Sequence, residues 1–204
     1  MSIKIPETKV KFKDVFNLKN LYVMMHEYLI EEKWFGEGGP TGTTAGAMHS
    51  NIETLYLENF CQKGLHSGGK ELWVYWRLYK KPEGKYSGYL RYKLNIDFHG
   101  VYLQDREIMH QGKKIKVQWG ELEIFFNGTV ETDYKKEWEN HWFLKHFKEI
   151  YENRIMSQEL EKHEKILWRE IYRLTGVVKK YLDMRVFIPT PELTAYPKLY
   201  GMGE

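Results

Sequence analysis

Apolar and polar residues alternate from Glu71 to Tyr134, and a charged run with helical spacing follows directly from Lys135 to about Arg185. A period of two places successive side chains on opposite faces of a strand, whereas a period near 3.6 places them along one side of a helix. The order of the two patterns therefore predicts a sheet followed by a helical section. Because the connections between the predicted strands are short, an antiparallel meander is favoured over parallel strands.

The first predicted strand, Glu71–Tyr79, is apolar or aromatic on both faces, and the second, Tyr86–Phe98, has one clearly apolar face. The opposite face of the second strand carries Arg91 and Lys93. We therefore expect an α+β protein with a sheet of four to six strands, an N-terminal helix and a long C-terminal helical section.

The flanking segments complete the predicted organisation. Leu21, Met25 and Leu29 recur at helical spacing and predict a helix over residues 18–34, with Asn17 as its cap. The segment 52–61 fits either a short helix or a strand. The predicted division is an extended arm over 1–14, one domain over 15–185 with a Gly-rich loop at 36–50, the sheet at 71–133 and helices at 135–185, and an extended tail over 186–204.

Two apolar stripes run along the C-terminal helical section. Leu160, Leu167, Leu174 and Tyr181 recur every seven residues, which is typical of a helix packed on another element. An earlier stripe is out of phase with them, and its members are Trp138, Phe143, Phe147, Ile150 and Tyr151. The change of phase predicts a bend or break within residues 153–158.

Composition narrows the classes of function without selecting one. The formal charge of +3 comes from 31 basic and 28 acidic residues, so nucleic-acid binding is allowed but not indicated. A single cysteine, Cys61, excludes an intramolecular disulfide and fits a reducing interior. No signal-peptide core and no apolar run of membrane-spanning length is found, so we expect a cytoplasmic protein with no membrane span. No motif identifies a reaction, and no cofactor is predicted.

The aromatic content, with 7 Trp, 15 Tyr and 10 Phe, exceeds what a small core can enclose and favours interfaces. We therefore expect a structural subunit that binds copies of itself, in a tube or filament, although other proteins are also allowed as partners. The arm, the first strand and the tail supply the predicted interface residues: Ile3, Ile5, Trp73, Tyr75, Tyr79, Tyr196, Leu199 and Tyr200.

Two alternatives remain open. Arg77, Tyr89, Arg91 and Lys93 could form an aromatic and basic face that binds RNA or single-stranded nucleic acid. Asp97 and His99 lie two residues apart on a predicted strand and share a face, so they could act as an acid and base. They could also hold a metal together with His110 or His49, as in a metal-dependent enzyme.

Three segments resemble a set of small archaeal proteins to which no activity is assigned. These are HEYLIEEKW at 26–34, the run from Tyr89 to Tyr134, and the EWENH that follows. The resemblance covers most of 15–183 and implies one compact α+β unit. The Gly-rich insertion and the proline-containing tail depart from it, and no ligand or catalytic residue is implied by it.

Overall fold

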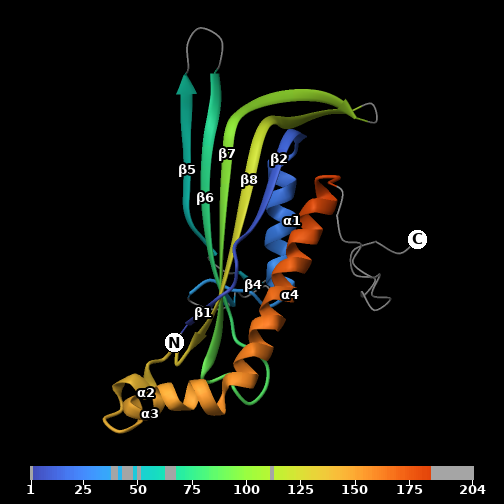
Figure 1. Cartoon of the computed structure of the whole chain (residues 1–204). Coiled ribbons are helices and arrows are strands. Elements are labelled where there is room, and N and C mark those ends of the chain that lie inside the picture. The colour runs from blue at the N-terminus through green and yellow to red at the C-terminus, as the bar shows by residue number, and fades with distance from the viewer. Residues whose placement is uncertain are drawn as a thin grey trace, which may run out of the picture.

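The computed structural model describes residues 2–37, 41–42, 48–49, 52–62, 68–110 and 113–184. They form an antiparallel sheet of six strands with an N-terminal helix and a C-terminal helical section (Figure 1). The predicted α+β class with a meander sheet is confirmed. In this part of the chain no helix combines the length and the apolar character needed to cross a bilayer.

The strands of the main sheet lie in the spatial order β1-β8-β7-β6-β5, and β2 also pairs with β8. A separate ladder joins β3 (Thr41–Gly42) to β4 (Met48–His49). The six strands are β1 (Ser2–Lys4), β2 (Thr8–Phe16), β5 (Glu53–Gln62), β6 (Gly68–Lys80), β7 (Leu90–His110) and β8 (Lys113–Thr132). The helical elements are α1 (Leu18–Glu31), α2 (Glu137–Asn140), α3 (Leu144–Ile150), the π-helix η2 (Tyr151–Ile155) and α4 (Ser157–Tyr181).

The sheet extends beyond the predicted range of 71–133 at both edges. The N-terminal segment, expected as an extended arm, forms β1 and β2 along β8 of the same chain. The segment 52–61, for which helix and strand were both open, contributes to the edge strand β5. The strands β7 and β8 run longer than the separate short strands that the alternation suggested, because their pairing continues past an irregularity at Val101–Gln104.

Helices α1 and α4 lie side by side on one face of the sheet (Figure 1). Asn17 caps α1 by accepting a hydrogen bond from the amide of Asn20 at 3.0 Å. The buried positions of α1 are Leu21, Met25 and Leu29, as predicted, and the helix ends at Glu31 rather than near residue 34. The heptad stripe of α4 is buried at Leu160, Leu167 and Leu174, together with Ile171 and Val178, whereas Tyr181 is exposed.

The predicted interruption of the helical section is also found. The π-helix η2 ends at Ile155, and α4 begins at Ser157 after the buried Met156. The helices α2 and α3 lie beyond this bend, at the end of the molecule remote from the β7–β8 tip (Figure 1). We call α2, α3 and η2, with the residues that join them, the foot.

The β7–β8 pair curves sharply at its far end (Figure 1). Tyr102 adopts a left-handed φ of 54° there, and Leu103 folds into the bend and is buried. A Cβ on Gly120 would lie 2.9 Å from the carbonyl oxygen of Val101, and a Cβ on Gly69 would lie 2.9 Å from the Cα of Tyr102. These two positions therefore require glycine for the backbones to approach.

Candidate functional site

The face of the sheet turned away from α1 and α4, which we call the open face, is both charged and aromatic. Its cations and carboxylates pair across neighbouring strands. Arg77 Nη1 lies 2.5 Å from Asp97 Oδ1, and Arg91 Nη2 lies 2.6 Å from Glu131 Oε2. Two of the three cations predicted to attract nucleic acid are therefore neutralised within the chain.

Asp97 and His99 share the open face, as their spacing predicted, but they have different partners. Asp97 accepts from Arg77, whereas His99 Nε2 lies 3.1 Å from Glu71 Oε1 and its ring stacks on Trp73 at 3.7 Å. Among the described side chains, no three His, Cys, Asp or Glu groups are placed to hold a metal ion. The side chains of His49 and His110, the suggested third ligands, lie outside the described part of the chain.

Trp73, Tyr75 and Tyr79 follow one another along β6 on the open face, as predicted. The rings of Trp73 and Tyr75 are stacked with centroids 6.1 Å apart. The guanidinium groups of Arg77 and Arg91 lie over Tyr75 at 5.2 Å and over Tyr79 at 4.4 Å. The result is a half-buried row of rings, already partly covered by cations, that a second surface could contact.

Tyr89 was expected beside Arg91 as a stacking platform, and the structure corrects this placement. Its hydroxyl donates to Glu152 at 2.7 Å, and its ring packs edge-on against Trp138 and Tyr151 of the foot. Burial, and then the hydrogen bond to Glu152, raise the pKa of Tyr89. The side chain joins the foot to the sheet and is not available to stack on a base.

The predicted interface residues of the N-terminal arm also need correction. Ile5 is only 6% exposed and belongs to the core, and Ile3 packs against that core. Because β1 pairs with β8 of the same chain, the burial of both side chains is explained within one molecule. Tyr196, Leu199 and Tyr200 of the tail lie outside the described residues.

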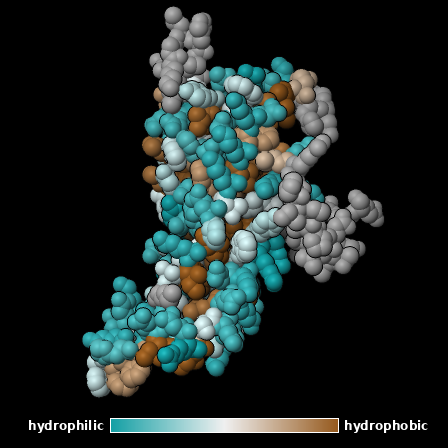
Figure 2. Space-filling view, in the orientation of Figure 1, coloured by the Kyte–Doolittle hydropathy of each residue, from teal (hydrophilic) through white to brown (hydrophobic). Residues whose placement is uncertain are grey.

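The edge strand β5 carries the first concentration of exposed apolar side chains. Every side chain from Thr54 to Phe60 is exposed. We call four of them the β5 patch: Leu55, Tyr56, Leu57 and Phe60, with Phe60 77% exposed. Figure 2 shows apolar residues along this margin of the molecule. No other described strand pairs with the outer side of β5, and an apolar surface on such an edge strand is typical of an interaction site.

The foot carries the second concentration. Trp142, Phe143 and Phe147 contact one another through their rings, with centroids 5.5 and 4.8 Å apart, and Ile150 lies one turn further along α3. All four are exposed, Trp142 at 76%, and we call them the foot patch. The described part of the chain leaves their outer surfaces uncovered, and an exposed apolar cluster of this kind is typical of an interaction site.

Asp133 fixes the foot to the end of β8. Its carboxylate accepts from the amides of Trp138 at 3.2 Å and Glu139 at 3.0 Å, and it lies 3.2 Å from Lys148 Nζ. Burial opposes ionisation of this group, but the two amides and the ammonium outweigh burial and hold the pKa of Asp133 below its usual value. One buried carboxylate therefore orients the elements that present the foot patch.

A cleft of about 350 Å³ opens between the end of α1, the β6–β7 connection and α4. The hydroxyl of Tyr92 and Nδ1 of His163 lie 2.6 Å apart in its lining, and Lys80 Nζ lies 2.9 Å from both carboxylate oxygens of Glu170. Burial lowers the pKa of His163 and raises that of Tyr92. The cleft could hold a small polar molecule, but these pairs also satisfy each other without one.

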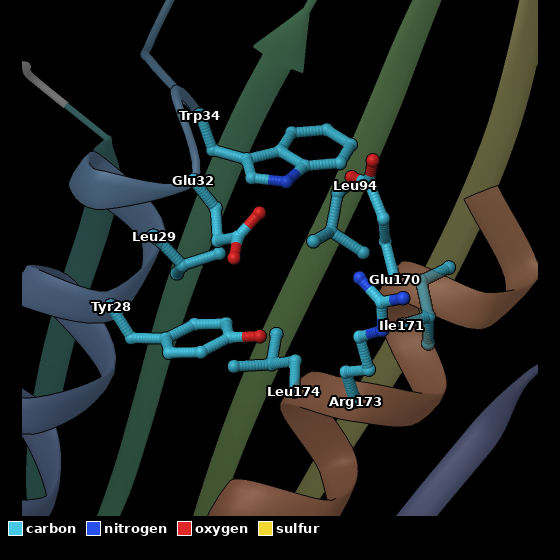
Figure 3. A pocket seen from close by; sticks show the side chains of 9 residues that line it. All are labelled: Tyr28, Leu29, Glu32, Trp34, Leu94, Glu170, Ile171, Arg173 and Leu174. Atoms are coloured by element: carbon cyan, nitrogen blue, oxygen red, sulfur yellow. The ribbon is translucent and has the colours of Figure 1, made fainter. Parts of the chain in front are cut away.

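A smaller space, of about 10 Å³, lies deeper between the two helices. Figure 3 shows the side chains around it: those from α1 and the segment after it face those from α4 across Leu94 of β7. The volume suits a single water molecule and no larger ligand.

Neither apolar patch was predicted as a site, although the sequence carries a signal for each. Leu55, Tyr56 and Leu57 are consecutive, so a strand there must be apolar on both faces. The out-of-phase stripe of the helical section supplies three members of the foot patch, Phe143, Phe147 and Ile150, but the pattern alone does not show that they point away from the core. No family model, no curated protein and no solved structure matches this chain.

Proposed function

We propose that this protein is a structural subunit that assembles with copies of itself in the cytoplasm. The observation that carries the proposal is the presence of two separate exposed apolar surfaces, the β5 patch and the foot patch, on different elements of one chain. Burial of apolar surface at about 25 cal/mol per Å² would supply the association energy. The paired charges of the open face would restrict how the copies align.

The number of patches bears on the kind of assembly. One self-complementary patch gives a closed pair, whereas two patches used together allow the contacts to continue from copy to copy. An extended assembly, such as a tube or filament, is therefore the form that we expect if both patches are used. Trp73, Tyr75 and Tyr79 on the open face and Tyr196, Leu199 and Tyr200 of the tail remain predicted contributors to it.

Light scattering over about a 100-fold range of protein concentration tests the proposal. The single chain has a mass of 24.6 kDa, and we expect a larger, concentration-dependent mass for the natural sequence. The variants Phe60→Lys and Trp142→Lys, each at a highly exposed position, should lower that mass with unchanged circular dichroism spectra. A mass of one chain at every concentration would contradict the proposal.

The nucleic-acid alternative predicts salt-sensitive binding of an oligonucleotide that is weakened by Arg77→Glu and Arg91→Glu. The metal-enzyme alternative predicts stoichiometric metal in the purified protein. The ion pairs of Arg77 and Arg91 and the separate partners of Asp97 and His99 favour neither, so self-assembly stays the leading proposal.

A further inference from the structure

We infer that β5 pairs edge to edge with β5 of a second copy of this chain, antiparallel and about a two-fold axis at Leu57. The inference rests on the proposed function and names the surface and the register through which it operates. It would join the two sheets into one continuous sheet that spans both molecules.

The outer edge of β5 is unpaired in the part of the chain that the structure describes. Among the described residues β5 pairs only with β6, so the main-chain groups on its other side have no strand to bond. The cross-strand register places Leu55 opposite Tyr75 and Leu57 opposite Trp73, on the open face, and Tyr56 opposite Val74, on the helix-covered face. The strand is therefore apolar on both faces at an edge, where an isolated protein normally carries polar side chains.

The residues of β5 favour another strand as the occupant. The strand reads ETLYLENFCQ and contains neither lysine nor proline, the residues that most often block pairing at an edge. Lys70 of the neighbouring strand lies 2.9 Å from Glu58 and 5.7 Å from the Phe60 ring, so this cation is held against β5 by the chain itself. A second copy offers an edge of the same length and the same alternation.

The symmetry of such a pair restricts its register. An antiparallel pair of identical edge strands is related by a two-fold axis perpendicular to the sheet, so residues that face each other must lie on the same side of it. An axis at Leu57 brings Leu57 against its own copy, Leu55 against Asn59 and Tyr56 against Glu58 of the second copy. An axis at Glu58 would place two carboxylates directly opposite each other, which is destabilising.

The pairing of β5 with β6 is irregular between Glu53 and Leu55, so the regular part of the strand begins at Leu55, and the axis at Leu57 pairs residues 55 to 59 within it. An axis at Tyr56 would pair only residues 55 to 57 there, and an axis at Asn59 would leave Leu55 unpaired. Among the registers that pair all three consecutive apolar residues, Leu55, Tyr56 and Leu57, the axis at Leu57 therefore gives the longest regular ladder that avoids opposed carboxylates. One strand pair buries less than the roughly 800 Å² per partner of a standard interface. We expect a dimer of moderate affinity that dissociates on dilution.

Disulfide trapping tests the register. In a Cys61→Ser background, Leu57→Cys places two thiols opposite each other at a separation of roughly 5 Å between Cα atoms, which suits a disulfide. Mild oxidation should convert most of this variant to a covalent dimer. Leu55→Cys alone should not cross-link efficiently, whereas Leu55→Cys with Asn59→Cys should. Lys11→Cys, at an exposed position of the opposite sheet edge, is the matched control and should stay a monomer under oxidation.

Two results separate this inference from the proposed function. If light scattering shows an assembly but Leu57→Cys remains uncross-linked, the β5 pairing is overturned while self-assembly stands. If Trp142→Cys cross-links instead, the foot patch is the contact between copies and the β5 inference is equally overturned. A single-chain mass for the natural sequence would overturn both. Efficient trapping of Leu57→Cys and not of Lys11→Cys supports the pairing and its axis.

Discussion

The two edges of the sheet are built differently. At one edge β2 carries Lys9, Lys11 and Lys13 on alternate positions, and Pro6 separates it from β1. Lys9 and Lys11 lie 2.9 and 3.1 Å from carboxylate oxygens of Glu123 on β8. A second strand that approached this edge would therefore meet a row of lysine side chains that ion pairs with β8 keep in place.

At the other edge β5 offers leucine, tyrosine and phenylalanine in place of lysine. Lysines on an edge strand prevent pairing between molecules, and an exposed apolar edge permits it. Within one sheet, therefore, lysine side chains can prevent one edge from pairing with another molecule while the opposite edge remains able to pair. The apolar edge indicates where the sheet continues into a second copy.

Leu57→Lys should weaken association by at least about 100-fold, because it places two ammonium groups together at the proposed axis. Leu57 is exposed in the single chain, so the stability of the monomer should change by only about 0.5 kcal/mol. Analytical ultracentrifugation measures the first effect, and urea unfolding at low concentration measures the second. Val23→Lys, at an exposed position on α1, is the control and should leave association unchanged.

Gly120→Ala should destabilise the chain by about 1–3 kcal/mol, because the added methyl group meets the carbonyl oxygens of Val101 and Tyr102 at 2.9 and 3.0 Å. Gly120 pairs with Asp14, so the change also disturbs the end of the β2 edge. The matched control is Gly176→Ala within α4, where no described atom outside the neighbouring residues and the adjacent helix backbone lies within 4 Å of the added Cβ, and it should stabilise the chain by about 0.5–1 kcal/mol. Thermal unfolding of both variants measures the two effects. Equal effects on stability would contradict the close approach of the backbone at Gly120 to that of Val101 and Tyr102.

Asp133→Asn should destabilise the chain by about 1–2 kcal/mol at neutral pH, because the charged acceptor of three hydrogen bonds is lost. The pKa of Asp133 is lowered in the folded chain, so its contribution is full above the unfolded value of about 3.9 and is lost as pH falls through the folded pKa. The natural chain should therefore lose more stability on acidification than the variant does. If urea unfolding shows that the natural chain and the variant lose equal stability as the pH falls, Asp133 does not hold the foot.

Lys9→Leu combined with Lys11→Leu should change the stability of the single chain by less than about 1 kcal/mol, because exposed ion pairs contribute little. The same change should nevertheless raise the mass of the assembly, since it removes the charge that closes the β2 edge. Lys19→Leu on α1 tests whether any exposed lysine has this effect. An equal rise in mass for that control would show that the position on the edge is irrelevant.

The sequence predicts the parts of this fold that depend on periodicity. The alternation of Leu90 to Phe98 and the heptads of Leu160 to Leu174 each identify a buried face, because packing against one side leaves a repeat in the chain. The bend before Ser157 is foreseen for the same reason, since it shifts the phase of the stripe.

Features that depend on partners far along the chain are not predicted in this way. Ile3 and Ile5 alternate as residues of any edge strand would, and only the pairing of β1 with β8 shows that their partner is internal. Tyr89 has the parity of Arg91, but its side chain turns to Glu152, 63 residues away. Asp97 and His99 share a face as their spacing requires, while their separate partners come from β6 and follow from the strand register.

The two exposed patches could not be predicted for a different reason. A sequence pattern shows which side chains are apolar, but it does not show whether other parts of the same chain cover them. Leu55 and Leu57 alternate like core residues, but they are exposed because they lie on the open face of an edge strand.

Amide hydrogen exchange at the two sheet edges, measured from low to high protein concentration, tests the central claim most directly. An unpaired edge exchanges quickly at alternate amides, whereas a paired edge is protected along its whole length. We predict that protection of residues 55–59 rises with concentration while protection of residues 8–16 stays constant, and that Leu57→Lys abolishes the rise. Exchange in β5 that stays independent of concentration while the protein assembles would contradict the account.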